Sequence, residues 1–346
     1  MSTHRAAQRA SWGVAATLSL ALGSCGPGAT SWQAVHTELP GAILAVWGSS
    51  ARDLYFVGSD ARDGTGPMFV HFDGSQWRHV DTGLTSGDLW WPFGLATGEL
   101  FVVGSSGVVL RYDRNATLQP TAMTTPDATA TLYGVWGPSA SDVWSVGSRV
   151  DTAGAVFPVL WHFDGTAWSD RSATLPASVA SRRLFKVWGT DATHVTVVGE
   201  RGTLLEWDGS QWTEVTTNVN PRVLTVHGHG SLRVAVGGTG TGVVLEDSGS
   251  GWHDVSPQFA PALNGVFATS DTDAVAVGIA GSVAHRTASG WAVDSNPPNT
   301  TWDFHAVWVD SEGGTWAVGG QIAMMPAGHG VIYHYGPSVP SDAIMR

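Results

Sequence analysis

The sequence predicts an all-β fold built from seven copies of one repeat, and three observations support this prediction. The 346 residues include 44 glycines and 18 tryptophans but only 13% charged residues, which suits short strands joined by tight turns. A motif of an aromatic residue followed by a Val-Gly step recurs along the chain. Asp-Gly pairs between apolar stretches favour hairpins. Together these features predict a β-propeller.

The repeat is clearest in three segments that read LAVWG, LYGVWG and LFKVWG, each followed by a Val-Gly step. The aromatic position, or its substitute, recurs every 39 to 52 residues, which is the length of a propeller blade. Its seven copies are Trp47, Phe93, Trp136, Trp188, His227, Phe267 and Trp308. The Val-Gly glycines are Gly58, Gly104, Gly147, Gly199, Gly237, Gly278 and Gly319.

Each repeat contains four apolar stretches, which we name strands a to d. Strand a carries the aromatic residue, strand b ends in Val-Gly, strand c precedes Asp-Gly and strand d carries a tryptophan. Glycine in these turns takes the positive φ that a primed hairpin turn requires. Four-stranded antiparallel blades are therefore expected, although the second repeat has no tryptophan in strand d.

The sequence also predicts how the ring of blades closes. The seventh repeat ends after strand c, whereas a tryptophan stretch, SWQAVHT, stands alone at residues 31–37. This stretch would complete the last blade and remove two exposed sheet edges. We therefore expect one closed domain over residues 31–336 and a tail over residues 337–346.

These repeats resemble the blades of secreted bacterial propellers of the broad BNR and Asp-box-like kind, over essentially the whole chain after residue 30. The Asp-box places one residue between its aspartate and glycine, whereas the pairs here are adjacent, as in Asp73-Gly74. The resemblance therefore implies a propeller fold and no particular activity.

The first residues predict export. His4, Arg5 and Arg9 precede an apolar run from Trp12 to Leu22, which is the pattern of a signal peptide over residues 1–24. The run ends in Leu-Gly-Ser-Cys25, which resembles the lipobox of bacterial lipoproteins. Cys25 is the only cysteine, so it is predicted to carry lipid, with residues 25–30 as a tether and the outer membrane or cell surface as location. The alternative is an ordinary secreted protein with a chance cysteine.

Composition disfavours a nucleic-acid partner, because 29 acidic residues exceed 17 basic ones and Lys186 is the only lysine. No cofactor or metal site is predicted. His227 and His229 supply only two possible metal ligands, and residues 60–66 lack the alternating oxygen ligands of a calcium loop.

Most conspicuous residues follow from the repeat itself. The strand a aromatics and the strand d tryptophans are expected to pack between blades. Asp53, Glu99, Asp142 and Asp273 recur before the Val-Gly step, so we expect them to bond nearby backbone amides in the a–b turns. The strand d tryptophans are Trp32, Trp77, Trp168, Trp212, Trp252 and Trp291.

Four residues do not follow from the repeat, and they are the predicted ligand contacts. Trp90, Trp91 and Trp302 lie at or just before strand a, and Lys186 and Trp91 replace a small residue two positions before the strand a aromatic. The b–c connections also vary in length while the a–b turns do not, which favours the b–c face as the binding face.

The sequence therefore predicts a lipid-anchored envelope propeller that binds a protein or a glycan. Catalytic residues cannot be assigned. The alternative is a glycan-active enzyme, a hydrolase or lyase, whose two carboxylates would lie about 5–10 Å apart in a shared pocket.

Overall fold

The computed structural model describes residues 31–116, 119–322 and 327–345. The predicted signal peptide, the tether and Cys25 lie outside these residues. The described part is built from β-strands and three single-turn 3₁₀ helices, Ser172–Thr174, Ala177–Val179 and Ile279–Gly281. No described helix is long and apolar enough to cross a membrane.

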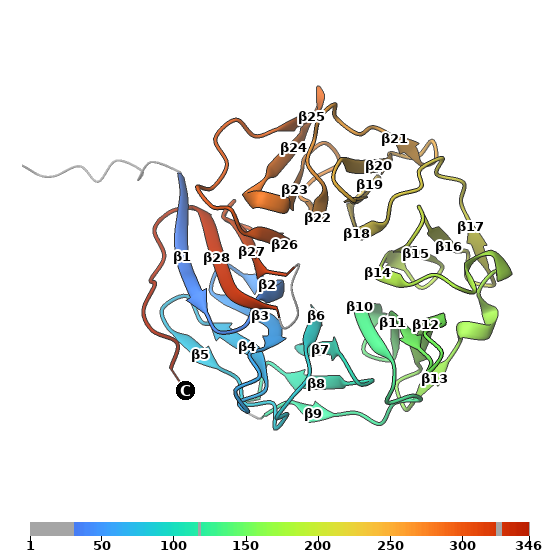
Figure 1. Ribbon diagram of the computed structural model, residues 1–346, viewed down its shortest axis with the longest axis horizontal. Helices are drawn as coiled ribbons and strands as arrows, with labels where there is room; N and C mark the ends of the chain where they lie inside the picture. Colours follow the sequence, from blue (N-terminus) through green and yellow to red (C-terminus); the bar gives the residue numbers. More distant parts are fainter. Residues whose placement is uncertain (1–30, 117–118, 323–326, 346) are drawn as a thin grey trace, which may run out of the picture.

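Seven four-stranded antiparallel sheets form a ring around a central channel, which confirms the predicted fold (Figure 1). In each blade the first strand lines the channel and the fourth lies at the rim. The first blade contains β2 (Ile43–Ser50), β3 (Asp53–Asp60), β4 (Pro67–Phe72) and β5 (Trp77–His79). The second contains β6 (Leu89–Gly94), β7 (Glu99–Gly104), β8 (Val109–Asp113) and β9 (Thr121–Ala122). The third contains β10 (Thr131–Ser139), β11 (Asp142–Val150), β12 (Val156–Phe163) and β13 (Trp168–Asp170).

The remaining blades follow in chain order. The fourth contains β14 (Leu184–Asp191), β15 (His194–Gly199), β16 (Leu204–Trp207) and β17 (Trp212–Glu214). The fifth contains β18 (Val223–His229), β19 (Leu232–Gly238), β20 (Gly242–Asp247) and β21 (His253–Asp254). The sixth contains β22 (Leu263–Ala268), β23 (Ala274–Gly278), β24 (Val283–Thr287) and β25 (Gly290–Val293). The seventh contains β26 (Asp303–Val309), β27 (Thr315–Gln321), β28 (Gly328–Gly336) and the N-terminal β1 (Ser31–Leu39).

The ring closes as the sequence predicts. Strand β1 pairs antiparallel with β28, with Trp32 opposite Tyr335 and Leu39 opposite Gly330. Val35 and Leu39 of β1 are buried. The first and last described segments thus share one blade, so unfolding of the ring must break this seam.

The C-terminal tail packs on the first blade. The Trp77 indole N–H donates to the Pro340 carbonyl at 2.9 Å. The backbone N–H of His79 donates to the Met345 carbonyl at 2.8 Å, and the Met345 N–H donates to the Trp77 carbonyl. The tail therefore runs beside β5 and covers the edge of that blade.

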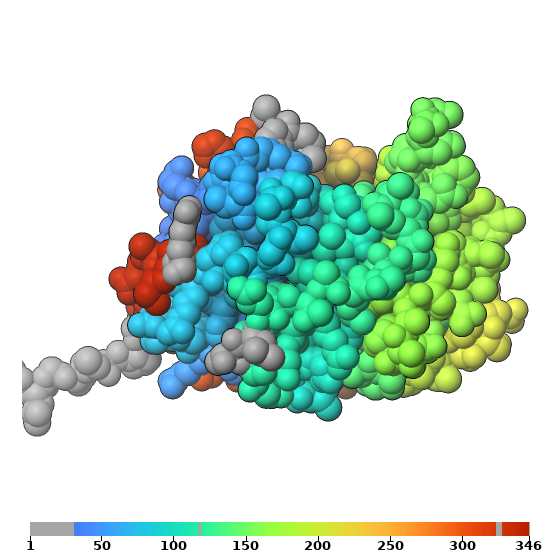
Figure 2. Space-filling model, turned by 90° about the horizontal axis from the view of Figure 1, so that it is seen from below, coloured from blue at the N-terminus to red at the C-terminus, as the bar shows by residue number. Residues whose placement is uncertain are grey.

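The b–c connections differ in length, as the sequence indicates. The β11–β12 hairpin projects from this face, and it stands out at residues near 150 in Figure 2. Val150 at its tip is 49% exposed. The third blade therefore forms a raised part of the b–c face.

Every inner strand contains a β-bulge at the same place. The pairing between strands a and b shifts by one residue three positions before the aromatic, so that residue has no partner on strand b. A bulge places neighbouring residues on the same side of a strand. The bulged residues are Leu44, Trp90, Tyr133, Phe185, Leu224, Asn264 and His305.

The strand a aromatics pack between blades, as expected, and each tryptophan lies on a glycine of the next blade. A Cβ added to Gly94 would lie 2.3 Å from the Trp47 ring, and one on Gly228 would lie 2.4 Å from Trp188. Gly48 and Gly189 meet Trp308 and Trp136 in the same way. Where the preceding blade carries His227 or Phe267, the glycine is replaced by Ala268 or Val309. The glycine makes room for an indole at these four positions, whereas Gly137, which follows the blade of Phe93, contacts no indole in this way.

The rim tryptophans confirm the packing prediction where they are most buried. Trp77 contacts Trp316 of the last blade at 6.2 Å between ring centroids, and Trp212 contacts Trp144 at 5.6 Å. In the second blade Met123 directly follows strand d, and its sulfur accepts the indole N–H of Trp168 from the third blade. Neighbouring blades are thus held together by aromatic contacts at the rim as well as beside the channel.

Two expectations about turns are wrong. Asp53 accepts a hydrogen bond from His71 Nε2 at 2.9 Å, and Asp142 accepts one from His162 Nε2 at 2.7 Å, instead of from backbone amides. The strand c histidine reaches the aspartate because it pairs with the strand b residue two positions later, as His71 pairs with Tyr55. The second wrong expectation is the two-residue turn at Asp73-Gly74. The hairpin is present, but its loop has four residues, since Phe72 pairs with Trp77. The Asp73 carboxylate accepts the N–H groups of Ser75 and Gln76 within this longer loop.

We predict that removing residues 31–39 will destabilise the protein far more than removing residues 337–345. Loss of β1 exposes the β28 edge and the sites of two buried apolar side chains, worth about 3–6 kcal/mol together. The tail contributes a few hydrogen bonds and partly buried contacts. Thermal unfolding of both deletions measures the difference. Equal melting temperatures for the β1 deletion and the intact chain would contradict the closure.

We also predict that Gly94→Ala will lower the free energy of unfolding by about 1–3 kcal/mol, because its Cβ meets the Trp47 ring. Trp47→Phe should remove most of that loss when both changes are combined, since the smaller ring leaves room. A double-mutant cycle in urea measures the coupling. Strict additivity of the two changes would contradict the packing argument.

Candidate ligand-binding site

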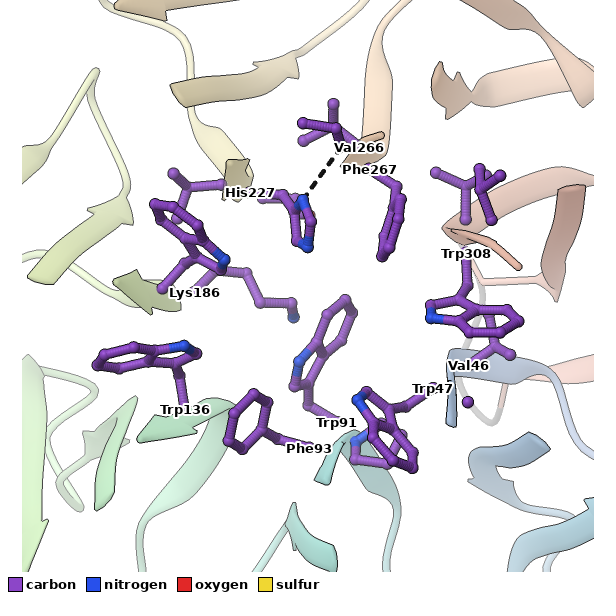
Figure 3. A pocket seen from close by; sticks show the side chains of 18 of the residues that line it. Val46, Trp47, Trp91, Phe93, Trp136, Lys186, His227, Val266, Phe267 and Trp308 are labelled. Atoms are coloured by element: carbon purple, nitrogen blue, oxygen red, sulfur yellow. Dashed lines mark hydrogen bonds between the residues drawn. The ribbon is translucent and has the colours of Figure 1, made fainter. Parts of the chain in front are cut away.

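The central channel contains a chamber at the end where the a–b turns lie. Its volume is about 490 Å³, and all seven strand a aromatics line it (Figure 3). Polar residues also line it, and those near its outer end are Ser49, His229, Thr269, Asp310 and Ser311. We call this space the aromatic chamber. Ring faces arranged in this way can hold a flat apolar or sugar-like body.

A second chamber, also of about 490 Å³, lies toward the b–c face. All seven bulged residues line it, and we call it the bulge chamber. Trp90 packs edge-on against Tyr133 at 5.0 Å between ring centroids, and Tyr133 packs edge-on against Phe185. The buried indole nitrogen of Trp90 has no hydrogen-bond partner among the described residues. The charged residues Asp88, Arg222 and Asp303 also line this chamber.

The two chambers meet at a waist formed two positions before the strand a aromatic. Neighbouring inner strands approach closely here, and a Cβ on Gly134 would lie 3.0 Å from the Lys186 Cα. Small residues are therefore required at most of the seven positions. Lys186 and Thr225 line both chambers, and Trp91 lines the aromatic chamber.

Lys186 and Trp91 meet in the middle of the channel. The Lys186 ammonium lies 4.0 Å from the centroid of the Trp91 ring, and Figure 3 shows the two side chains pointing toward each other. Lys186 Nζ also donates to the Tyr133 carbonyl at 2.6 Å. That carbonyl belongs to a bulged residue, so the bulge exposes an acceptor that the next blade satisfies.

The carbonyls of two other bulged residues accept a hydrogen bond from the preceding blade. The Thr225 hydroxyl donates to the Asn264 carbonyl at 2.6 Å, and the His305 Nδ1–H donates to the Leu44 carbonyl. Asn264 in turn donates its side-chain amide to the Phe304 carbonyl. Together with the Lys186–Tyr133 bond, these contacts join four of the seven pairs of neighbouring blades around the waist.

Burial controls the charge of three channel residues. Lys186 is 4% exposed, and desolvation lowers the pKa of Lys186 to about 7. Desolvation also lowers the pKa of His305 to about 3, with a further contribution from the nearby positive charge of Lys186. The pKa of His227 falls to about 3 for the same first reason. At neutral pH both histidines are uncharged.

His227 has a defined hydrogen-bonding role. Its Nδ1 accepts the backbone N–H of Ala268 at 3.0 Å, the contact drawn in Figure 3. The ring stacks on Phe267 at 4.2 Å between centroids. Since Nδ1 is an acceptor, the proton of the neutral ring is on Nε2, which makes that nitrogen a donor.

The structure brings three of the four predicted ligand contacts to the channel. Lys186 and Trp91 touch at the waist, and Trp90 lies beside them in the bulge chamber. Trp302 lines neither chamber. It stacks on His329 of the same blade, with ring centroids 5.4 Å apart. The role of Trp302 in binding, on the predicted b–c face, stays a prediction.

Sequence reasoning missed two parts of this site. The strand a aromatics were assigned to packing, yet Trp47 and Trp188 also line the aromatic chamber. Tyr133 and His305 were not singled out, although they share the bulged position of Trp90. Seven-fold comparison of the position three before the aromatic would have found them.

The site does not gather metal ligands within the described residues. No group of three or more His, Cys, Asp or Glu side chains there could hold a metal ion. His229 instead lies 3.9 Å from Asp271, at the exposed end of β18. The aromatic chamber is lined mainly by aromatic side chains, with Lys186 and His227 among its polar residues.

Comparisons with known proteins define the class. No protein-family model matches the chain, and no curated protein is significantly similar in sequence. Among solved structures, YCF48 bound to D1 peptide has a TM-score of 0.64 at 12% identity, covering 89% of this chain and 97% of that one. The extracellular domain of the putative hybrid two-component system BT4673 from B. thetaiotaomicron has a TM-score of 0.63 at 10% identity, covering 88% of this chain and 40% of that one. A streptogramin B lyase has a TM-score of 0.54 at 10% identity, covering 88% and 96%. This protein is thus a seven-bladed β-propeller.

Burial of Lys186, His227 and His305 predicts that the folded state loses stability toward low pH, because each pKa is lowered on folding. The unfolded chain protonates Lys186 below its ordinary pKa of 10.5, whereas the folded chain does so only below about 7. Stability from this group is therefore greatest above pH 10 and falls as the pH drops to 7, by on the order of 4 kcal/mol. His227 and His305 extend the loss from pH 6.5 down to about 3.

Urea unfolding of wild type and Lys186→Gln from pH 6 to 10 measures the lysine contribution. The difference in stability between the two proteins should change steadily across this range, with the variant favoured at pH 6. If the free energies of unfolding of the two proteins change in parallel with pH, Lys186 is not a buried amine that titrates in this range. His305 and Arg222, which line the bulge chamber together with Lys186, are unchanged in both proteins and provide the common background.

Proposed function

We propose that this protein is a lipid-anchored binding module of the cell envelope, which holds a protein or glycan ligand in its central channel. One observation carries the proposal: two large residues that break the repeat, Trp91 and Lys186, meet inside a chamber lined by the strand a aromatics. The resemblance to secreted BNR-like propellers and the predicted signal peptide support an envelope location.

The geometry favours binding because the chamber is lined mainly by aromatic side chains. Trp47, Phe93 and Phe267 present rings around its wall, and Lys186 and His227 supply nitrogen donors. Aromatic surface with a few placed donors is the usual composition of a ligand pocket. YCF48, which shares the fold, has been solved with a D1 peptide, so a propeller of this form can accept a peptide.

A glycan-active enzyme is the second candidate, because the bulge chamber contains two carboxylates. Asp88 accepts the backbone N–H of Asp60 at 3.0 Å, and Asp303 accepts the N–H of Ala280 at 2.9 Å. Both are thus held in place by the fold. If a glycan bound by wild type is shortened during incubation and Asp303→Asn prevents this, the enzyme replaces the binding module.

Lipidation has a direct test. The full chain expressed in a diderm bacterium with labelled palmitate should incorporate label and remain with membranes. Cys25→Ala should lose both properties, because no other cysteine is present. Equal labelling and equal release of the two proteins would rule out the anchor.

Binding is tested with glycan and peptide arrays and the full chain in detergent. For a ligand captured by wild type, Trp91→Ala should raise the Kd at least tenfold, because a central aromatic contact is a typical hot spot. Trp252→Phe, at the rim of the fifth blade, is the matched control and should leave the Kd unchanged. If Trp302→Ala weakens binding and Trp91→Ala does not, the ligand binds on the b–c face and not in the channel.

A further inference from the structure

The side chain of Lys186 is the feature of the channel that packing explains least. It is the only lysine of the chain, and the other six waist positions hold Ala45, Trp91, Gly134, Thr225, Gly265 and Ala306. It is 4% exposed, and no carboxylate among the described residues forms an ion pair with it, while desolvation lowers the pKa of its amine. A buried cation without an anion is unfavourable unless something else supplies the partner.

The contacts of the amine leave capacity for one more partner. An ammonium group has three donors. One goes to the Tyr133 carbonyl, and the face of Trp91 receives the positive charge on another side. Lys186 lines both chambers, so its remaining side faces the channel space (Figure 3).

We propose that Lys186 binds the carboxylate of the ligand, and that the apolar body of the same ligand lies in the aromatic chamber. This inference rests on the proposed function and names the ligand class: an organic acid whose flat or hydrocarbon body contacts the ring formed by Trp47 and its six equivalents. The carboxylate forms a charge-assisted hydrogen bond with Lys186 Nζ, which is strong where water is excluded.

Structural bonding to Tyr133 is the competing role of Lys186. A neutral donor would satisfy the Tyr133 carbonyl equally well, as Thr225 does for the equivalent carbonyl of Asn264. The positive charge adds nothing to that contact that the fold needs. The negative net charge of the chain slows approach of an anion, but salt screens this effect beyond about 10 Å at 0.1 M.

The experiment uses matched pairs of small probes with the full chain in detergent. Hydrocinnamate and hydrocinnamide differ only in charge and have an aromatic body. Glucuronate and glucose form the corresponding pair with a sugar body, which distinguishes the two kinds of acid. Calorimetry or ligand-observed NMR at pH 6.5 and 0.1 M salt gives each Kd.

Wild type should bind at least one acid tenfold or more tightly than its neutral partner. Lys186→Gln, which keeps a donor for Tyr133, should abolish that preference, and Lys186→Arg should retain it. Thermal unfolding checks that both variants are folded. Equal affinity within both pairs, a preference that persists in Lys186→Gln, or no saturable binding of any of the four probes would overturn the carboxylate assignment.

Failure of this inference is distinguishable from failure of the binding module. If hydrocinnamate and hydrocinnamide bind equally and Trp91→Ala weakens both, the channel is a binding site and only the carboxylate is wrong. If an array ligand is bound with no effect of Trp91→Ala, the proposed site itself fails.

Discussion

A bulge repeated in each inner strand determines the surface of the channel. Without it, strand alternation would face the aromatic residue and the residues two and four before it into the channel. The bulge turns the third residue inward and buries the fourth, as at Ile43, which is fully buried while Leu44 lines the bulge chamber. One irregularity thus creates two chambers with different walls and a narrow waist between them.

The bulge also creates a demand for hydrogen bonds. A bulged residue has no partner on strand b, so its carbonyl must be satisfied from elsewhere. A neighbouring blade supplies the donor for three of these carbonyls, from His305 to Leu44, from Thr225 to Asn264 and from Lys186 to Tyr133. Blade-to-blade cohesion and channel chemistry therefore come from the same side chains. Lys186 is the one that brings a charge to this position, which is why its role extends beyond cohesion.

Much of the fold could be predicted because propeller repeats are periodic. Blade number, strand order and the N-terminal closing strand follow from recurring letters, and Trp91 and Lys186 were found because they break the pattern. The bulge could not be predicted, since LAVWG reads as an ordinary alternating strand. Packing of Pro340 and Met345 on the first blade was also missed, because the tail has no strand pattern. Trp302 shows the opposite limit: it breaks the pattern, yet it stacks on His329 away from the channel.

The claim that ligand is held between the strand a aromatics is tested most directly by ¹⁹F NMR of the full chain labelled with 5-fluorotryptophan. Resonances are assigned by single Trp→Phe changes, and hydrocinnamate is then titrated. The account predicts shifts at Trp47, Trp91 and Trp188, which line the aromatic chamber, and none at the rim residues Trp77 and Trp212. Shifts at the rim tryptophans with unchanged channel signals would contradict it.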